Sequence, residues 1–156
     1  MRSRLWRYGP LVLWLVGIFF ASTDGLSGSK TTLVIEPLLR WFFPHISRES
    51  VEAIHLLVRK AGHLTEYAVL ALLAARAFSA STHALLRIHW FLVSLVLVAG
   101  YALSDEYHQS FVPSRTASIY DSLIDIAGGL LALVLIVLWQ SRRKRRRNAR
   151  PVKGQA

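Results

Sequence analysis

The sequence predicts an all-α protein, an integral membrane helical bundle of about four transmembrane helices. Hydrophobic residues make up 53% of the 156-residue chain and are gathered into four apolar blocks. The 19 Lys and Arg residues fall mainly between and after these blocks, as is typical of segments that flank membrane spans. One domain is the natural number for this length, so we assign a transmembrane domain to residues 1–141 and a basic tail to residues 142–156.

The composition excludes several kinds of site. The chain contains no Cys, which excludes disulfides, thiolate catalysis and Cys-based zinc or iron–sulfur centres. The formal net charge of +10 invites a nucleic-acid interpretation, but much of the excess lies in residues 142–147, directly after an apolar block. Basic clusters beside a membrane span usually set topology or contact anionic lipid. We therefore expect membrane lipids as partners and no nucleic acid.

The first span is expected at about residues 5–22. The uncharged run Leu11–Ala21, extended back to Leu5, is near the minimum length for crossing a hydrocarbon core of roughly 30 Å. Three arginines precede this run, so a signal peptide is the alternative. Residues 20–23 form only a mediocre cleavage site, which favours a retained helix.

Residues 22–57 form a mixed segment. Ser22–Thr32 is rich in Ser, Gly and Thr and is expected to be a loop. Leu33–Phe43 contains Trp and Phe but is too short to span, so it is expected to be either an amphipathic element in the headgroup region or a lid packed on the helices. Ser47–Val58 is expected to begin a helix before the membrane, with Ser50 as its N-cap.

The other three spans are expected at about residues 61–80, 88–107 and 119–139, with a short turn at Ser79–Arg87 and Trp139 as an interfacial anchor. If both termini are cytoplasmic, thirteen basic residues lie inside and six lie outside. The positive-inside rule favours this orientation, and the even number of spans agrees with it.

In this orientation the ionisable residues of the spans gather at the outer face. Together with the neutral Gln109, they occupy the start of the second span, the end of the third and the start of the fourth: Lys60, His63, Glu66, Tyr67, Asp105, Glu106, His108, Asp121 and Asp125. Within a span such groups cost about 2.5–3.5 kcal/mol at the centre, and they are tolerated where they face the bundle interior and pair with one another. We expect Lys60 and Arg115 to pair with the carboxylates.

Helical spacing sharpens this prediction. Lys60, His63 and Tyr67 lie at i, i+3 and i+7 and share one helical stripe. Asp121, Asp125 and Gly128 lie in the same relation on the fourth span.

The sequence here resembles the VanZ-like membrane proteins over roughly residues 55–140. The residues that carry the resemblance are Lys60-x2-His63-x3-Tyr67, then Asp105-Glu106-x2-Gln109-x3-Pro113-x-Arg115-x5-Asp121, then Gly128. Two positions depart from the family pattern, which has Asn where Asp125 stands and Gly where Ala132 stands. Asp125 adds a titratable carboxylate, whereas Ala132 extends a small-residue stripe with Gly128 and Gly129 that permits close helix approach.

The resemblance implies a multi-pass protein of the bacterial cytoplasmic (inner) membrane. The best-known member of the family is associated with low-level resistance to the glycopeptide teicoplanin, so the resemblance also implies an effect on glycopeptide susceptibility. The resemblance predicts the transmembrane architecture of the protein better than it predicts a ligand or a reaction.

Three interpretations of the polar cluster remain open. The first is an outward-facing pocket that binds or acts on an anionic cell-envelope component, such as a lipid-linked phosphate, a teichoic-acid phosphate or a peptide-stem carboxylate. The second is a brace that only holds the helices together, as in a structural or scaffold subunit. The third is a metal site through His63, His108 and carboxylates, but no short His spacing selects a metal. We expect no metal and no cofactor, and an oligomer remains possible.

Candidate residues follow from the first interpretation. His63 is the candidate general acid or base, because His changes charge near neutral pH, and Glu66 or Asp105 would orient it. The catalytic candidates are His63, Glu66, Asp105 and Glu106. The ligand-binding candidates are Lys60, Gln109, Arg115, Asp121 and Asp125.

Overall fold

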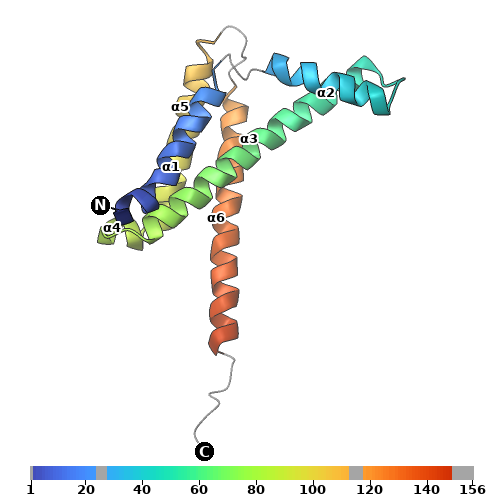
Figure 1. Cartoon of the computed structure of the whole chain (residues 1–156). Coiled ribbons are helices and arrows are strands. Elements are labelled where there is room, and N and C mark those ends of the chain that lie inside the picture. Colours follow the sequence, from blue (N-terminus) through green and yellow to red (C-terminus); the bar gives the residue numbers. More distant parts are fainter. Residues whose placement is uncertain (1, 24–27, 113–117, 149–156) are drawn as a thin grey trace, which may run out of the picture.

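The computed structural model describes residues 2–23, 28–112 and 118–148. In these ranges the chain forms six helices and no strand (Figure 1). The helices are α1 (Arg2–Ala21), α2 (Gly28–Phe42), α3 (Arg48–Ser79), α4 (Ala84–Ile88), α5 (Trp90–Gln109) and α6 (Ile119–Asn148). The all-α fold class is confirmed.

The four long helices α1, α3, α5 and α6 pack into one bundle, with α3 at its centre. α3 contacts each of the other three, and its most extensive contact is with α6. Small residues dominate the buried face of α3 and let its neighbours approach closely. The buried apolar core comprises Leu11, Ile18, Tyr67, Leu70, Ala71, Ala74, Ala75, Ala77, Val98, Ala102, Ala132 and Leu133.

Two adjacent glycines set the distance between α6 and its neighbours. A Cβ at Gly128 would collide with the backbone carbonyl of Leu64 on α3. A Cβ at Gly129 would lie 2.6 Å from Cγ1 of Val98 on α5. The small-residue stripe expected on this helix therefore lies where α6 crosses α3 with its backbone against the backbone of α3.

α5 and α6 are long and apolar enough to cross a bilayer. In α5 only 28% of the 18-residue apolar stretch is buried inside the protein, and in α6 only 33% is. The core helix of a soluble protein is mostly buried instead. α1 and α3 do not meet the same criterion over the described residues, because arginines begin α1 and polar residues occupy the middle of α3. Large apolar side chains such as Leu13, Leu72, Leu131 and Leu135 are exposed on all three of α1, α3 and α6.

The segment between α1 and the bundle part of α3 differs from the expectation in two respects. Residues 28–32, expected to be a loop, are helical and begin α2, a helix that contacts α3; the weak helix propensity of Ser, Thr and Gly did not predict this start. The N-cap of α3 is Ser47 rather than Ser50, since Ser47 Oγ accepts a hydrogen bond from the backbone N–H of Ser50 at 3.1 Å. α3 then runs for 32 residues without a break.

The other boundaries lie close to the expected ones. The turn at Ser79–Arg87 contains the short helix α4. Residues 142–148 of the basic tail continue α6, and Arg143 lies over the ring of Trp139 with its guanidinium carbon 5.4 Å from the ring centroid. The rest of the tail, residues 149–156, lies outside the described residues.

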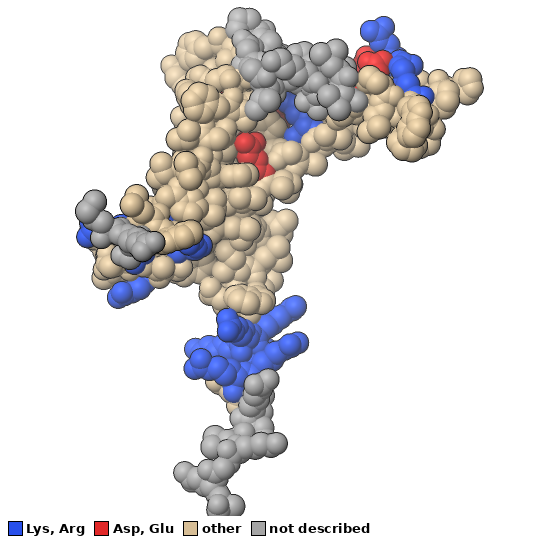
Figure 2. All heavy atoms as spheres, viewed as in Figure 1, with Lys and Arg blue, Asp and Glu red and all other residues tan. Residues whose placement is uncertain are grey.

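Charge is distributed unequally between the two ends of the bundle. The start of α1, the end of α3, α4 and the C-terminal part of α6 lie toward one end (Figure 1). Figure 2 shows Lys and Arg gathered along the C-terminal part of α6 and beside the N-terminus, whereas the acidic atoms visible in that view lie toward the opposite end. The buried carboxylates Asp105, Glu106 and Asp125 belong to this opposite end, where α5 finishes and α6 begins.

The close crossing of α3 and α6 gives a stability prediction. Gly128→Ala should lower the stability of the bundle by about 1–3 kcal/mol, because the new methyl group meets backbone, which cannot rotate away. The matched control is Gly62→Ala on α3, where a Cβ would meet nothing within 4 Å. Thermal unfolding in detergent would measure both, and equal stability of the two variants would contradict the close crossing.

Candidate functional site

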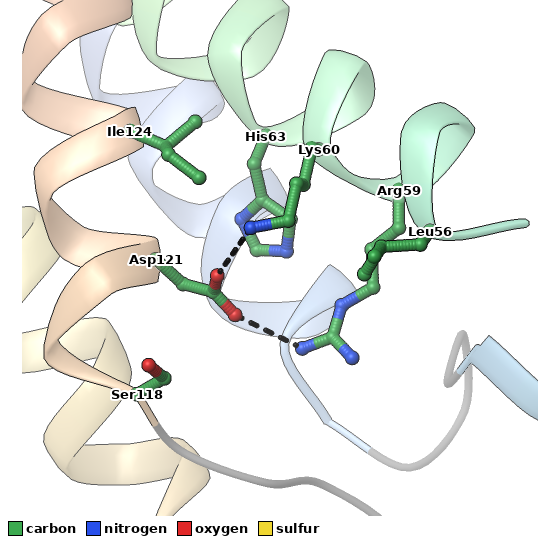
Figure 3. Close-up of a pocket in the computed structure, with 7 residues that line it drawn as sticks. All are labelled: Leu56, Arg59, Lys60, His63, Ser118, Asp121 and Ile124. Carbon is green, nitrogen blue, oxygen red and sulfur yellow. Dashed lines mark ion pairs between the residues drawn. The ribbon is translucent and has the colours of Figure 1, made fainter. Parts of the chain in front are cut away.

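A pocket opens between α3 and the start of α6, at the end of the bundle that carries the buried carboxylates (Figure 3). Its cavity volume is about 150 Å³. Among the described residues its lining is formed by Leu56, Arg59, Lys60, His63, Ser118, Asp121 and Ile124. The helical repeat explains this selection, because residues three and four apart on α3 and on α6 share one face.

Asp121 lies between two cations in this pocket. Its Oδ2 is 3.5 Å from Arg59 Nη2 and its Oδ1 is 3.6 Å from Lys60 Nζ (Figure 3). All three side chains are partly exposed. One carboxylate therefore faces two positive charges across the gap between α3 and α6.

Arg59 is a pocket residue that the sequence analysis did not select. It lies next to Lys60 and four residues before His63, so the helical spacing that selected Lys60 also places Arg59 on the pocket face. The sequence analysis selected Lys60 because this residue belongs to the VanZ-like pattern. Arg59 does not belong to that pattern, so its favourable helical spacing was overlooked.

The carboxylate next to His63 is that of Asp125, whereas the sequence analysis offered Glu66 or Asp105 for this position. His63 Nδ1 is 3.4 Å from Asp125 Oδ1, and the Asp125 side chain is fully buried. The two atoms make a close electrostatic contact rather than a well-aligned hydrogen bond. Asp125 therefore lies behind the pocket, where it faces His63 from α6.

A second polar layer ties α1, α5 and α6 together beside the pocket. Glu106 Oε2 accepts a hydrogen bond from the backbone N–H of Ser118 at 2.7 Å. Gln109 Nε2 donates to Asp105 Oδ2 at 2.9 Å and to Ser22 Oγ at 3.4 Å. Asp105, Glu106 and Gln109 are buried and lie outside the described pocket lining, so their contacts brace the helix ends.

Two further candidates lie on the face of α3 that turns toward the bundle. Tyr67 is fully buried, and its hydroxyl makes no hydrogen bond within the described part of the chain. One residue earlier, the backbone carbonyl of Glu66 accepts a hydrogen bond from Trp14 Nε1 of α1 at 3.0 Å. A similar bond from Tyr101 to the carbonyl of Leu15, at 2.5 Å, fixes α1 to α5.

The metal interpretation finds no support in the described ranges. No group of three or more His, Asp or Glu side chains there is placed to hold a metal ion. His108, which that interpretation paired with His63, lies against the ring of Phe19 with the ring centroids 4.9 Å apart. Arg115, the remaining ligand-binding candidate, lies outside the described residues.

In a comparison with protein families, the family model described as VanZ/LLP1 matches residues 8–140. The match extends well beyond the segment that carried the resemblance and includes every described residue of the pocket lining. No curated protein and no solved structure matches the chain.

The contact between Arg59 and Asp121 can be measured by a double-mutant cycle of Arg59→Gln and Asp121→Asn. We expect a coupling free energy of about 1 kcal/mol, because the pair is only partly exposed to solvent. Arg48→Gln combined with Asp121→Asn is the control, since Arg48 is far more exposed and its ion pair is with Glu52. Unfolding in detergent would give both couplings, and equal values would show that Asp121 does not hold Arg59.

Proposed function

The chain belongs to the VanZ/LLP1 family, and from this membership we propose a multi-pass protein of the bacterial cytoplasmic membrane whose outward-facing pocket binds an anionic component of the cell envelope. The chemistry of binding rests on the pocket rather than on the family.

The excess of positive charge in the pocket carries this proposal. Arg59 and Lys60 face one carboxylate, Asp121, at 3.5 and 3.6 Å. Both separations are longer than the 2.7–2.9 Å of a strong charge-assisted hydrogen bond, so Asp121 leaves much of the donor capacity of the two cations unused. Arg59 Nη2 is buried and makes no hydrogen bond to the described residues. An anion with several oxygen atoms, such as a phosphate or a carboxylate, would satisfy these donors.

The proposed orientation has four spans, α1, α3, α5 and α6, with both termini in the cytoplasm. It is supported by the concentration of Lys and Arg at the end of the bundle that holds the N-terminus and the C-terminal part of α6 (Figure 2). α1 and α3 would cross the bilayer within the bundle, where α1 packs on α3 and where Arg59, Lys60 and His63 of α3 face carboxylates of α6. The pocket then faces the outside.

His63 gives this pocket one group that can exchange a proton near neutral pH. A reaction of the bound anion would use His63 as acid or base, with Asp125 holding the imidazole at 3.4 Å. Binding alone requires only the two cations, so it is the function that we propose first. Through this binding the protein would alter susceptibility to teicoplanin-type glycopeptides, as the family resemblance implies.

A structural or scaffold subunit is the second candidate. The hydrogen bonds from Ser118 to Glu106 and from Gln109 to Ser22 favour it, because they connect the end of α5 to the start of α6 and to the end of α1 without using the pocket. In that case the ion pairs of Asp121 would also serve only to brace the helices.

The orientation predicts the location of reporter fusions. Fusions after Arg147 and within the turn between α3 and α4 should report a cytoplasmic location, because the basic residues hold these ends inside. A fusion between α5 and α6 should report the outside. An external signal from a fusion after Arg147 would overturn the outward-facing pocket.

The binding role predicts a separation between stability and function. Arg59→Lys keeps the charge but removes the planar fork, so it should weaken a ligand-dependent phenotype about fivefold while membrane abundance stays unchanged. Arg48→Lys is the matched control on the same helix. The measurement is teicoplanin susceptibility of a sensitive bacterial host that carries each variant at equal membrane level.

A brace would give a different result in the same assay. Membrane abundance and phenotype would then fall together across Arg59→Lys, Arg59→Gln and Asp121→Asn, and that result would favour the scaffold function.

A further inference from the structure

We infer that the anion bound between α3 and α6 is the phosphate of a membrane lipid, which reaches the pocket from the outer leaflet while its acyl chains stay in the bilayer. This inference rests on the proposed binding function and names its ligand class.

The depth of the pocket is the first observation. Asp121 and Trp139 are about 18 residues apart on α6, a rise of roughly 27 Å at 1.5 Å per residue. This rise is close to the roughly 30 Å thickness of a hydrocarbon core. If Trp139 lies at one interface, Asp121 and its partners Arg59 and Lys60 lie at the level of the opposite headgroups.

Exposed aromatic side chains support this depth. Trp41, Tyr107 and Tyr120 are 70–75% exposed and belong to the ends of α2 and α5 and the start of α6, beside the pocket end of the bundle. Exposed Trp6 and Trp139 belong to the first turns of α1 and to the C-terminal part of α6, and these two parts of the helices lie toward the opposite end (Figure 1). Trp and Tyr concentrate at the two membrane–water interfaces, so these two groups mark the two headgroup levels.

The position and the composition of α2 also indicate that the pocket lies at the level of the lipid headgroups. Figure 1 shows α2 running roughly crosswise to α6, next to the first turns of α3. Its C-terminal end carries exposed Trp41 and Phe42, while Glu36 and Arg40 form an ion pair at 2.9 Å. A helix with apolar and charged residues on different sides is suited to lie in the interface plane.

The walls of the pocket distinguish a lipid from a soluble anion. Leu56 and Ile124 line the pocket together with the cations, and Leu56 is 53% exposed. A phosphate joined to a hydrocarbon chain would contact this apolar surface, whereas a free phosphate or a soluble peptide carboxylate would gain nothing from it.

The charge of the pocket fits a phosphodiester. Arg59, Lys60 and Asp121 together carry one net positive charge, which one phosphodiester group would neutralise. Asp125 is fully buried behind the pocket and faces His63 at 3.4 Å.

The test uses the purified full-length chain in an uncharged detergent and three probes: phosphatidylglycerol, phosphatidylcholine and inorganic phosphate. The pocket variant is Arg59→Gln/Lys60→Gln/Asp121→Asn, which removes the two cations without leaving a carboxylate unpaired. Arg48→Gln is the control, because both proteins lose one net positive charge and both keep the basic end of α6. Binding would be measured by native mass spectrometry, with thermal unfolding as the check that each protein is folded.

We expect the wild-type chain and Arg48→Gln to bind phosphatidylglycerol at least tenfold more tightly than the pocket variant does. We also expect the wild-type chain to prefer phosphatidylglycerol to phosphatidylcholine and to bind inorganic phosphate far more weakly. If inorganic phosphate binds as tightly as the lipid and is lost in the pocket variant, the lipid assignment is wrong and the anion-binding function stands. If the folded pocket variant binds every probe as the wild-type chain does, both fail.

If the pocket variant does not fold, Arg59→Lys takes its place. That variant should then lose part of its preference for phosphatidylglycerol over phosphatidylcholine, and an unchanged preference would overturn the inference.

Discussion

The backbone contact between Gly128 of α6 and Leu64 of α3 is the constraint on which the rest of the bundle depends. No side chain can stand between the two helices at this point, because even a methyl group would meet the Leu64 carbonyl. The crossing brings the start of α6 beside residues 56–63 of α3, and therefore brings Asp121 beside Arg59 and Lys60. The same α6 backbone approaches Val98 of α5 through Gly129.

This packing also explains how several acids are tolerated at one end of a bundle with an apolar exterior. Glu106 and Asp125 each lie next to a polar group on another segment, whereas Asp105 is bonded within α5. Asp105 accepts from Gln109, Glu106 accepts from the Ser118 backbone, and Asp125 faces His63. These contacts offset part of the cost of burying the carboxylates, but Glu106 Oε1 and both carboxylate oxygens of Asp125 make no hydrogen bond to the described residues.

The sequence allowed much of this arrangement to be predicted, because hydropathy and helical spacing are local properties. The apolar blocks located α1, α5 and the apolar part of α6 closely, and spacing placed Lys60, His63 and Asp121 within reach of one another. The choice of Asp125 as the neighbour of His63 was not predictable, because it depends on how α6 is rotated against α3. The helical start of α2 was missed because local helix propensity is low there, and propensity is only a weak guide to helix boundaries.

The unbroken length of α3 has a mechanical consequence. α3 is a stiff rod that is held at the Gly128 crossing near Leu64 and extends about 24 Å from there to Arg48, at 1.5 Å per residue. Arg59 lies only about 8 Å from the same crossing on that scale. If α3 tilts about the crossing at Leu64, Arg59 moves about one third as far as Arg48 at the start of the helix. Such a tilt would therefore change the distance between Arg59 and Asp121 by much less than it would move the end of α3.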